Sequence, residues 1–177
     1  MRRLRRQLFS LTVLFFFTVA GVIAQVTPPV SATGHITAEV IPIFSASETS
    51  QMNFGRFSPG PSGGKVIITP QGTVSVMGSV VSGSGIHNAA SFYITGDTFT
   101  SFSITLPKSS VALTNISNAK TMLVTNWLSV PSTGPGGGTL KDGFMTVFIG
   151  ATLEVGTIND NPVGIYTGTY VLTFEFN

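Results

Sequence analysis

The sequence predicts an all-β protein in which short strands pack face to face as a β-sandwich. Apolar residues alternate with polar or small ones along many segments, most clearly over residues 144–155, and this period of two is typical of half-buried strands. No window of eleven or more residues after Ala24 keeps the 3.6-residue period of an amphipathic helix. The 20 glycines and 10 prolines divide the chain into short segments, as expected for a domain of strands and turns.

Residues 1–24 predict a secretory signal peptide. Four arginines within residues 2–6 precede an apolar run of 16 residues from Leu8 to Ile23, an order that is typical of export signals. The run is shorter than the about 20 residues that a membrane-spanning helix needs. We expect cleavage after Ala24 and no stable membrane anchor afterwards, because the chain has no cysteine to carry a lipid.

The mature chain is mildly acidic. After Ala24 it carries five cations and seven acids, a net charge of −2. A nucleic-acid partner would need a basic surface, so none is expected. Without cysteine there is no disulfide, and a chain of this length can bury one apolar core of its own.

Strands are expected in order along the mature chain, separated by turn-forming residues. The predicted strand ranges are 35–41, 52–57, 65–69, 73–77, 90–95, 100–106, 110–114, 121–127, 144–155 and 165–176. Residues 25–42 are interpreted as an N-terminal leader with a candidate strand, and residues 43–177 as the β-sandwich domain. Residues 131–138 are rich in glycine, proline and serine, which predicts a mobile loop.

The sequence offers no set of residues for catalysis, a metal or a cofactor. His35 and His87 are the only histidines, and a metal centre usually needs three or four ligands. No G-x-S-x-G motif and no local pair of carboxylates is present, so we do not expect an enzyme. The segment Asn159-Asp160-Asn161 is expected to form a tight turn, with loose calcium binding as an open alternative.

The last segment of the chain carries the strongest pattern. Apolar side chains alternate through to the penultimate residue. The pattern comprises Tyr166, Tyr170, Leu172, Phe174 and Phe176, preceded by Gly164. A chain terminus frays unless something holds it, so we expect this strand to be buried in the fold or bound by another protein.

These features resemble two groups of bacterial proteins. Phe176 is penultimate and Gly164 stands fourteenth from the end, as in subunits of chaperone–usher pili. The motifs Asn53-Phe54-Gly55, Gly150-Ala151-Thr152-Leu153 and Gly164 to Tyr170 resemble the secreted family called domain of unknown function 4402, over residues 35–177. The second resemblance implies a bacterial surface or periplasmic protein and supplies no catalytic residue. The first implies an immunoglobulin-like, pilin-like sandwich that strand exchange completes.

The N-terminal leader contains a candidate donor strand. Its small and apolar residues alternate with polar ones up to Pro42. The candidate donor residues are Gly34, Ile36, Ala38 and Val40. The pilin resemblance implies that this strand fills a groove in a neighbouring copy. An ordinary first strand that completes its own domain explains the pattern equally well.

The functional expectation follows from these resemblances. It is a structural subunit of a bacterial surface fibre that is assembled by donor-strand exchange and contributes to adhesion. Its expected partners are copies of itself or related subunits, with a periplasmic chaperone and an outer-membrane usher. It would pass through the periplasm to the cell surface or an extracellular fibre. The alternative is a self-contained secreted module that binds carbohydrate, with Trp127 and Tyr93 as a stacking platform, or another surface protein.

We predict that the exported protein begins at Gln25 and carries no lipid. The intact mass of material recovered from outside the cytoplasm should equal that of residues 25–177 without modification. A mass that retains residues 1–24 would instead identify the apolar run as a membrane anchor.

Overall fold

The computed structural model describes residues 29–40 and 43–176. The chain divides into two units, Met1–Glu39 and Val40–Asn177. The described part of the first unit is exposed and contains no strand. The strand expected at 35–41 is therefore not formed over residues 35–40, and the expected signal peptide lies outside the described residues.

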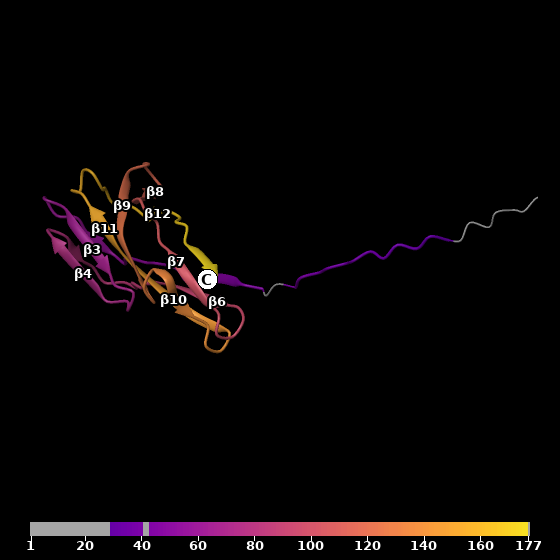
Figure 1. Ribbon diagram of the computed structural model, residues 1–177. Coiled ribbons are helices and arrows are strands. Elements are labelled where there is room, and N and C mark those ends of the chain that lie inside the picture. The colour runs from indigo at the N-terminus through magenta and orange to yellow at the C-terminus, as the bar shows by residue number, and fades with distance from the viewer. Residues whose placement is uncertain (1–28, 41–42, 177) are drawn as a thin grey trace, which may run out of the picture. The chain divides into compact units, whose positions relative to one another are not determined.

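The second unit consists of strands joined by turns (Figure 1). The strands are β1 (Ser45–Ser50), β2 (Phe57–Ser58), β3 (Gly64–Ile68), β4 (Val74–Gly78), β5 (Val81–Ser82), β6 (Ala90–Thr95), β7 (Ser101–Thr105), β8 (Val111–Asn115), β9 (Thr121–Val130), β10 (Gly134–Thr139), β11 (Phe144–Val155), β12 (Tyr166–Thr167) and β13 (Thr173–Phe176). The expected all-β class is thus confirmed.

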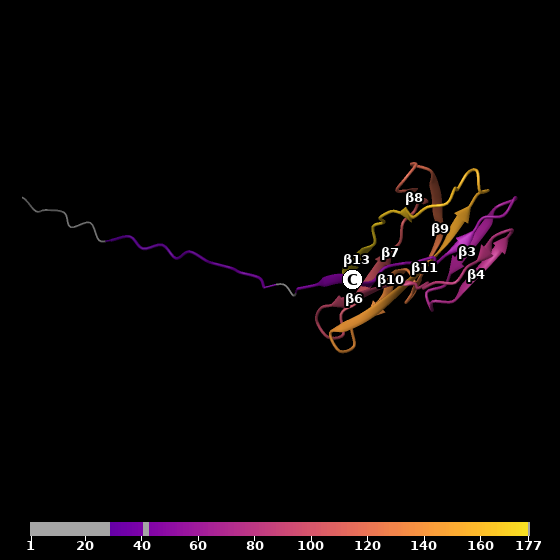
Figure 2. The ribbon, with the colours of Figure 1, turned by 180° about the vertical axis from the view of Figure 1, so that it is seen from behind.

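The strands form three antiparallel sheets. The largest has the order β1-β6-β11-β9-β8-β12, with β3 paired to β11 and β4 paired to β3. A second sheet has the order β10-β7-β13, and β2 pairs with β5. Figure 2 shows the same arrangement from behind.

Strand β11 organises the large sheet because it pairs with three others. One edge pairs with β6 over residues 144–149 and with β3 over residues 151–155, and the other edge pairs with β9. Gly150 lies where the partner changes from β6 to β3. A Cβ atom there would collide with the carbonyl oxygen of Ile68, so only glycine permits this close approach of two backbones.

The core consists of two apolar clusters. One is centred on Val66, Met122, Val124 and Leu153, and the other contains Phe102, Ile104, Ile94, Leu140 and Val147. β11 contributes residues to both clusters, because its side chains alternate between the two faces of the sheet and the strand is long enough to reach from one cluster to the other. Met52 and Trp127 pack against both clusters and so join them into one core.

The prediction of a mobile loop at residues 131–138 is wrong for residues 134–138. These residues belong to β10, which begins at Gly134 and pairs with β7. Glycine gives no apolar pattern to reveal a strand, but it allows the backbone to lie very close to a ring. Gly138 is buried against Phe102, and a Cβ atom at this position would overlap the ring. Backbone pairing and this contact therefore order the segment.

The polar strand β1 was also not expected. Its sequence Ser-Ala-Ser-Glu-Thr-Ser is mostly exposed, and its hydroxyl groups bond to β6. The hydroxyl oxygens of Ser45 and Thr95 lie 2.7 Å apart, and the Thr49 hydroxyl donates to the Ser91 carbonyl oxygen at 3.1 Å. Cross-strand hydrogen bonds thus hold this strand without an apolar face.

The expected C-terminal strand over 165–176 is divided in two. Its first part, β12, pairs with β8 of the large sheet, and its last part, β13, pairs with β7 of the second sheet. Residues 168–172 form no strand. The segment therefore passes from one sheet to the other.

We predict that Gly150→Ala lowers the free energy of unfolding by about 1–3 kcal/mol, because the added methyl group forces β11 and β3 apart. Urea denaturation measures this change. Ser75→Ala on the exposed strand β4 is the control, and its effect should stay within about 0.5 kcal/mol. Equal stability of the two variants would contradict the close approach at Gly150.

Candidate functional site

A groove with a cavity volume of about 1020 Å³ opens into the core of the second unit. One wall is formed by Glu48 and residues 51–59, and the other by residues 163–170. The floor is apolar and comprises Phe92, Val111, Leu113, Met122, Val124, Trp127 and Leu153. Met122, Val124 and Leu153 are nearly fully buried, whereas the other four floor residues are partly exposed. Partly exposed apolar side chains that lie together are typical of a binding surface.

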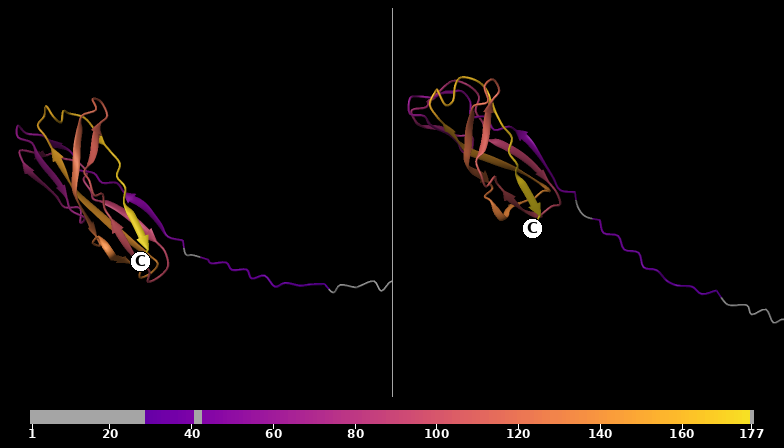
Figure 3. Two further views of the ribbon diagram at one scale, coloured as in Figure 1. Left: turned by 45° about the horizontal axis from the view of Figure 1, so that its top comes forward. Right: turned by 90° about the horizontal axis from the view of Figure 1, so that it is seen from above.

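Both walls continue strands that end a sheet. β1 is the first strand of the large sheet, and β12, which lies within the second wall, is the last strand of the same sheet. The second wall continues into β13, which ends the second sheet, and no ladder joins β1 to β12 or β13 in the described part of the chain. The walls run antiparallel, since Phe44 contacts Phe176 with ring centroids 4.2 Å apart while Glu48 lies near Tyr170. Figure 3 shows β1 in purple and the C-terminal segment in yellow on this side of the domain.

Aromatic rings pack together beside the end of the groove near Phe44. Phe44 also contacts Phe102 at 6.0 Å, and Phe92 contacts both Tyr170 and Phe174. The opposite end is bordered by Phe54, Phe57 and Tyr166, which pack against the first core cluster. Aromatic rings therefore border both ends of the groove.

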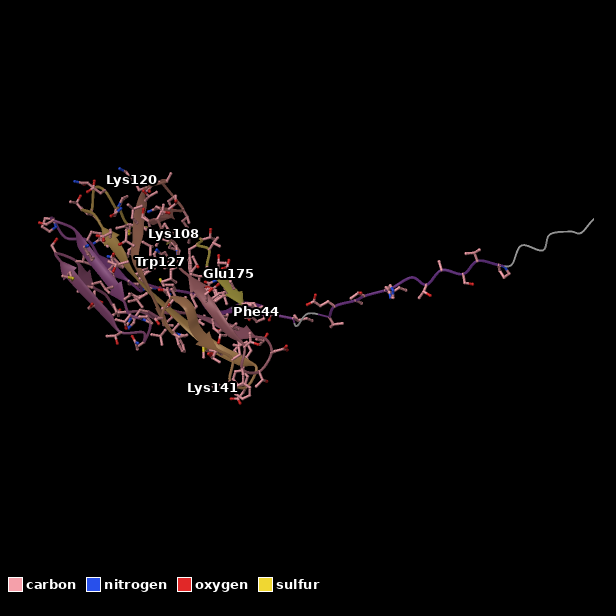
Figure 4. The ribbon with its side chains drawn as sticks, viewed as in Figure 1. Phe44, Lys108, Lys120, Trp127, Lys141 and Glu175 are labelled. Atoms are coloured by element: carbon pink, nitrogen blue, oxygen red, sulfur yellow. The ribbon has the colours of Figure 1, made fainter. Side chains whose placement is uncertain are left out.

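Trp127 and Tyr170 both line the groove and contact each other, with ring centroids 4.8 Å apart and ring planes tilted by 38°. Figure 4 labels Trp127 within the domain. Their polar atoms, the indole Nε1 and the phenol oxygen, are buried and have no hydrogen-bond partner among the described residues. Burial, and to a lesser extent the Glu48 carboxylate, raises the pKa of the Tyr170 hydroxyl above its usual range. A buried polar atom without a partner destabilises the fold.

The stacking platform expected from Trp127 and Tyr93 is not formed. Tyr93 lies on the outer face of β6 and stacks on Phe144, with ring centroids 5.7 Å apart and planes at 27°. Trp127 instead has Tyr170 as its partner. The sequence contains no signal for this pairing, since the two residues stand 43 positions apart and meet only through the fold.

The predicted C-terminal residues all contribute to the wall or the core beside it. Gly164 lies against Asn115, whose side chain is buried, and a Cβ on Gly164 would collide with the Asn115 carboxamide. The Tyr166 hydroxyl donates to the Pro162 carbonyl oxygen at 2.8 Å. Tyr170, Leu172 and Phe174 pack on the second core cluster, and Phe176 contacts Phe44 with the ring planes tilted by 49°.

The predicted donor residues lie in the exposed N-terminal segment. Ile36 is 99% and Val40 96% exposed, and a Cβ built on Gly34 would meet nothing within 4 Å. Ala38 is also exposed. The structure therefore leaves the apolar face of this segment without a partner among the described residues.

The family comparison matches residues 44–176 to a domain of unknown function, DUF4402. The chain belongs to the DUF4402 family. This confirms the resemblance seen in the sequence motifs. The match includes both walls of the groove and begins after the candidate donor segment. No curated protein and no solved structure matches the chain.

The segment Asn159-Asp160-Asn161 forms a turn in the DUF4402 domain. The Asp160 carboxylate accepts hydrogen bonds from the Thr157 hydroxyl and backbone, which hold its pKa below the ordinary value. Asn161 bonds to Gly156 and Thr121, so these oxygens and amides close a turn, as expected. Within the described ranges no three metal-ligating side chains gather, and no helix is long and apolar enough to span a bilayer.

We predict that Tyr170→Phe leaves the free energy of unfolding unchanged or raises it by up to about 1 kcal/mol, because it removes a buried hydroxyl without a partner. Tyr166→Phe is the matched control. It should cost about 1 kcal/mol, because it removes the hydrogen bond to Pro162. Chemical denaturation of both variants tests this, and a larger loss for Tyr170→Phe than for Tyr166→Phe would contradict the assignment.

Proposed function

We propose that this protein is a structural subunit of a bacterial surface fibre, in which residues 25–42 of one copy fill the groove of the next. The observation that carries the proposal is the groove itself, an apolar cavity of about 1020 Å³ bordered by two edge segments. Edge strands with exposed apolar surface tend to accept a further strand.

The order of the strands supports an immunoglobulin-like sandwich that lacks its last strand. Such a sandwich has the orders A-B-E-D and C-F-G. In space, β1-β6-β11-β9 corresponds to the order A-B-E-D, and β7-β13 corresponds to C-F. The order along the chain agrees, because β1, β6, β7, β9, β11 and β13 follow one another as strands A to F do. The position of strand G, beside β13, borders the same C-terminal segment whose residues 163–170 line the groove.

The N-terminal segment has the length and pattern of a strand that would fit this position. The wall formed by residues 163–170 spans about 26 Å if extended, and residues 32–40 span about 30 Å. Burial of Ile36 and Val40 would contribute roughly 1.5–3 kcal/mol each. Because the walls run antiparallel, the added strand would pair parallel to one wall and antiparallel to the other.

Export adds two transient partners to the proposal. An open groove in an unassembled subunit exposes apolar floor and strand edges, which promote aggregation. A periplasmic chaperone that covers the groove, and an outer-membrane usher that exchanges it for the next subunit, would protect the chain on its way to the surface. The assembled fibre would serve in adhesion.

A self-contained binding module is the second candidate, and one observation favours it. Tyr93 and Phe144 are 37% and 49% exposed, and their rings stack on each other, so the exposed part of this pair offers an aromatic surface to a sugar ring. A glycan that binds the full-length monomer and is lost in Tyr93→Ala would support this candidate in place of a fibre.

We predict that a chain lacking residues 25–41 binds a synthetic peptide of residues 30–42. Trp127, the only tryptophan, lies on the groove floor and should report binding by a change in fluorescence. The peptide variant Ile36→Asp should bind at least about tenfold more weakly, because a carboxylate would enter an apolar groove. Thr37→Asp on the opposite face is the control and should bind like the parent peptide.

A second variant keeps the test informative if the truncated chain is unstable. Residues 30–42 appended after Asn177 through a short glycine-rich linker should yield a soluble monomer with a higher melting temperature than the truncated chain. Full-length protein should form polymers that resist SDS, because strand-exchanged subunits dissociate slowly. Strand exchange would be ruled out if the truncated chain is a stable monomer that does not bind the peptide and if the appended segment does not raise its melting temperature.

A further inference from the structure

Four branched apolar side chains are exposed in two loops at one end of the domain. Ile116 follows β8, and Ile158, Val163 and Ile165 lie between β11 and β12, with exposed fractions from 44% to 89%. The Ile116 backbone N–H donates to the Ile165 carbonyl oxygen at 3.0 Å, so the two loops lie side by side. Single exposed apolar residues are ordinary, but a contiguous group indicates a contact surface. We call these four residues the loop cluster.

The loop cluster is continuous with the groove. Ile158, Val163 and Ile165 also line the cavity, whereas Ile116 does not. Figure 4 labels Lys120 at this end of the domain and Lys141 at the opposite end, with Phe44 toward the latter. A strand that fills the groove must therefore leave it either beside the loop cluster or beside Phe44.

Charge favours one direction for the strand that fills the groove. Among the described residues that line the groove, Glu48 and Arg56 are the charged ones, with Glu48 near the Tyr170 end and Arg56 eight positions further along the wall. A segment parallel to β1 brings Glu39 toward Arg56 and away from Glu48. The reverse direction would bring two carboxylates together, which is unfavourable.

In this direction the segment ends beside the loop cluster, and its own domain begins there. Val40 and Phe44 are four positions apart, a span of about 13 Å at most. The near end of that domain carries two exposed apolar side chains, Ile43 at 87% and Phe99 at 76%. Phe99 also has a φ of 65°, a left-handed conformation that is costly for a bulky residue.

We propose that the loop cluster of one copy docks Ile43 and Phe99 of the next, so that an apolar head-to-tail contact accompanies strand exchange. The proposal rests on the proposed fibre function. It explains why a strained aromatic side chain and four branched side chains are exposed at opposite ends of one domain. Two different surfaces in contact make a heterologous interface, which propagates as an open filament.

The test separates the docking contact from strand exchange. Ile116→Asp removes a cluster residue that does not line the groove, and Phe99→Asn places a residue that tolerates a positive φ. Leu128→Asp, at an exposed site on the outer face of β9, is the control. Each change is made in the full chain for assembly and in the chain lacking residues 25–41 for binding of the peptide of residues 30–42.

We expect all three variants to bind the peptide within about twofold of the parent. Ile116→Asp and Phe99→Asn should raise the protein concentration needed for half-maximal polymerisation by about tenfold, as measured by sedimentation, because each removes one buried apolar side chain. Leu128→Asp should polymerise like the parent.

Each contrary result has a distinct meaning. Parent protein that does not bind the peptide overturns the fibre function. Normal peptide binding with normal polymerisation of Ile116→Asp and Phe99→Asn overturns the docking contact and leaves strand exchange standing. A defect in Ile116→Asp alone shows that the loop cluster meets a different partner, and it too overturns the contact with Phe99.

Discussion

The pairing of β11 with three other strands is the interaction on which the rest of the domain depends. Because β6 and β3 share one edge of β11 and β9 occupies the other, the large sheet is fixed in register across its width. Its order leaves β1 outermost. With β12 at the other end of the large sheet and β13 at the end of the second sheet, the same arrangement produces the two antiparallel walls and leaves the apolar floor between them.

Much of the fold could be predicted because burial leaves a periodic trace in the sequence. The alternation over residues 144–155 predicts the bounds of β11 almost to the residue, since the two faces of this strand differ in polarity. β1 and β10 leave no such trace: one is held by hydroxyl and backbone hydrogen bonds and the other is mostly glycine. The break at residues 168–172 arises because the chain changes sheets, which no local pattern encodes.

One of the two walls of the candidate site could be predicted from the sequence. Gly164, Tyr166 and Tyr170 stood out because a chain end rich in aromatic residues needs a reason to be ordered, and they form one wall. The opposite wall, residues 51–59, has only partial alternation and is positioned by the bridge between Asn53 and Asn88. The contact between the rings of Trp127 and Tyr170 depends on tertiary packing alone, so sequence spacing could not reveal it.

The antiparallel pairing of β1 with β6 has a mechanical consequence. A pull on the chain at Ile43 enters the domain at Phe44, and the component of the pull that is parallel to β1 loads this strand along its axis. Hydrogen bonds between strands lie perpendicular to that axis, so the five residue pairs between β1 and β6 share the load in shear and do not open one after another. Tension applied at the N-terminal side is thereby carried directly into the large sheet.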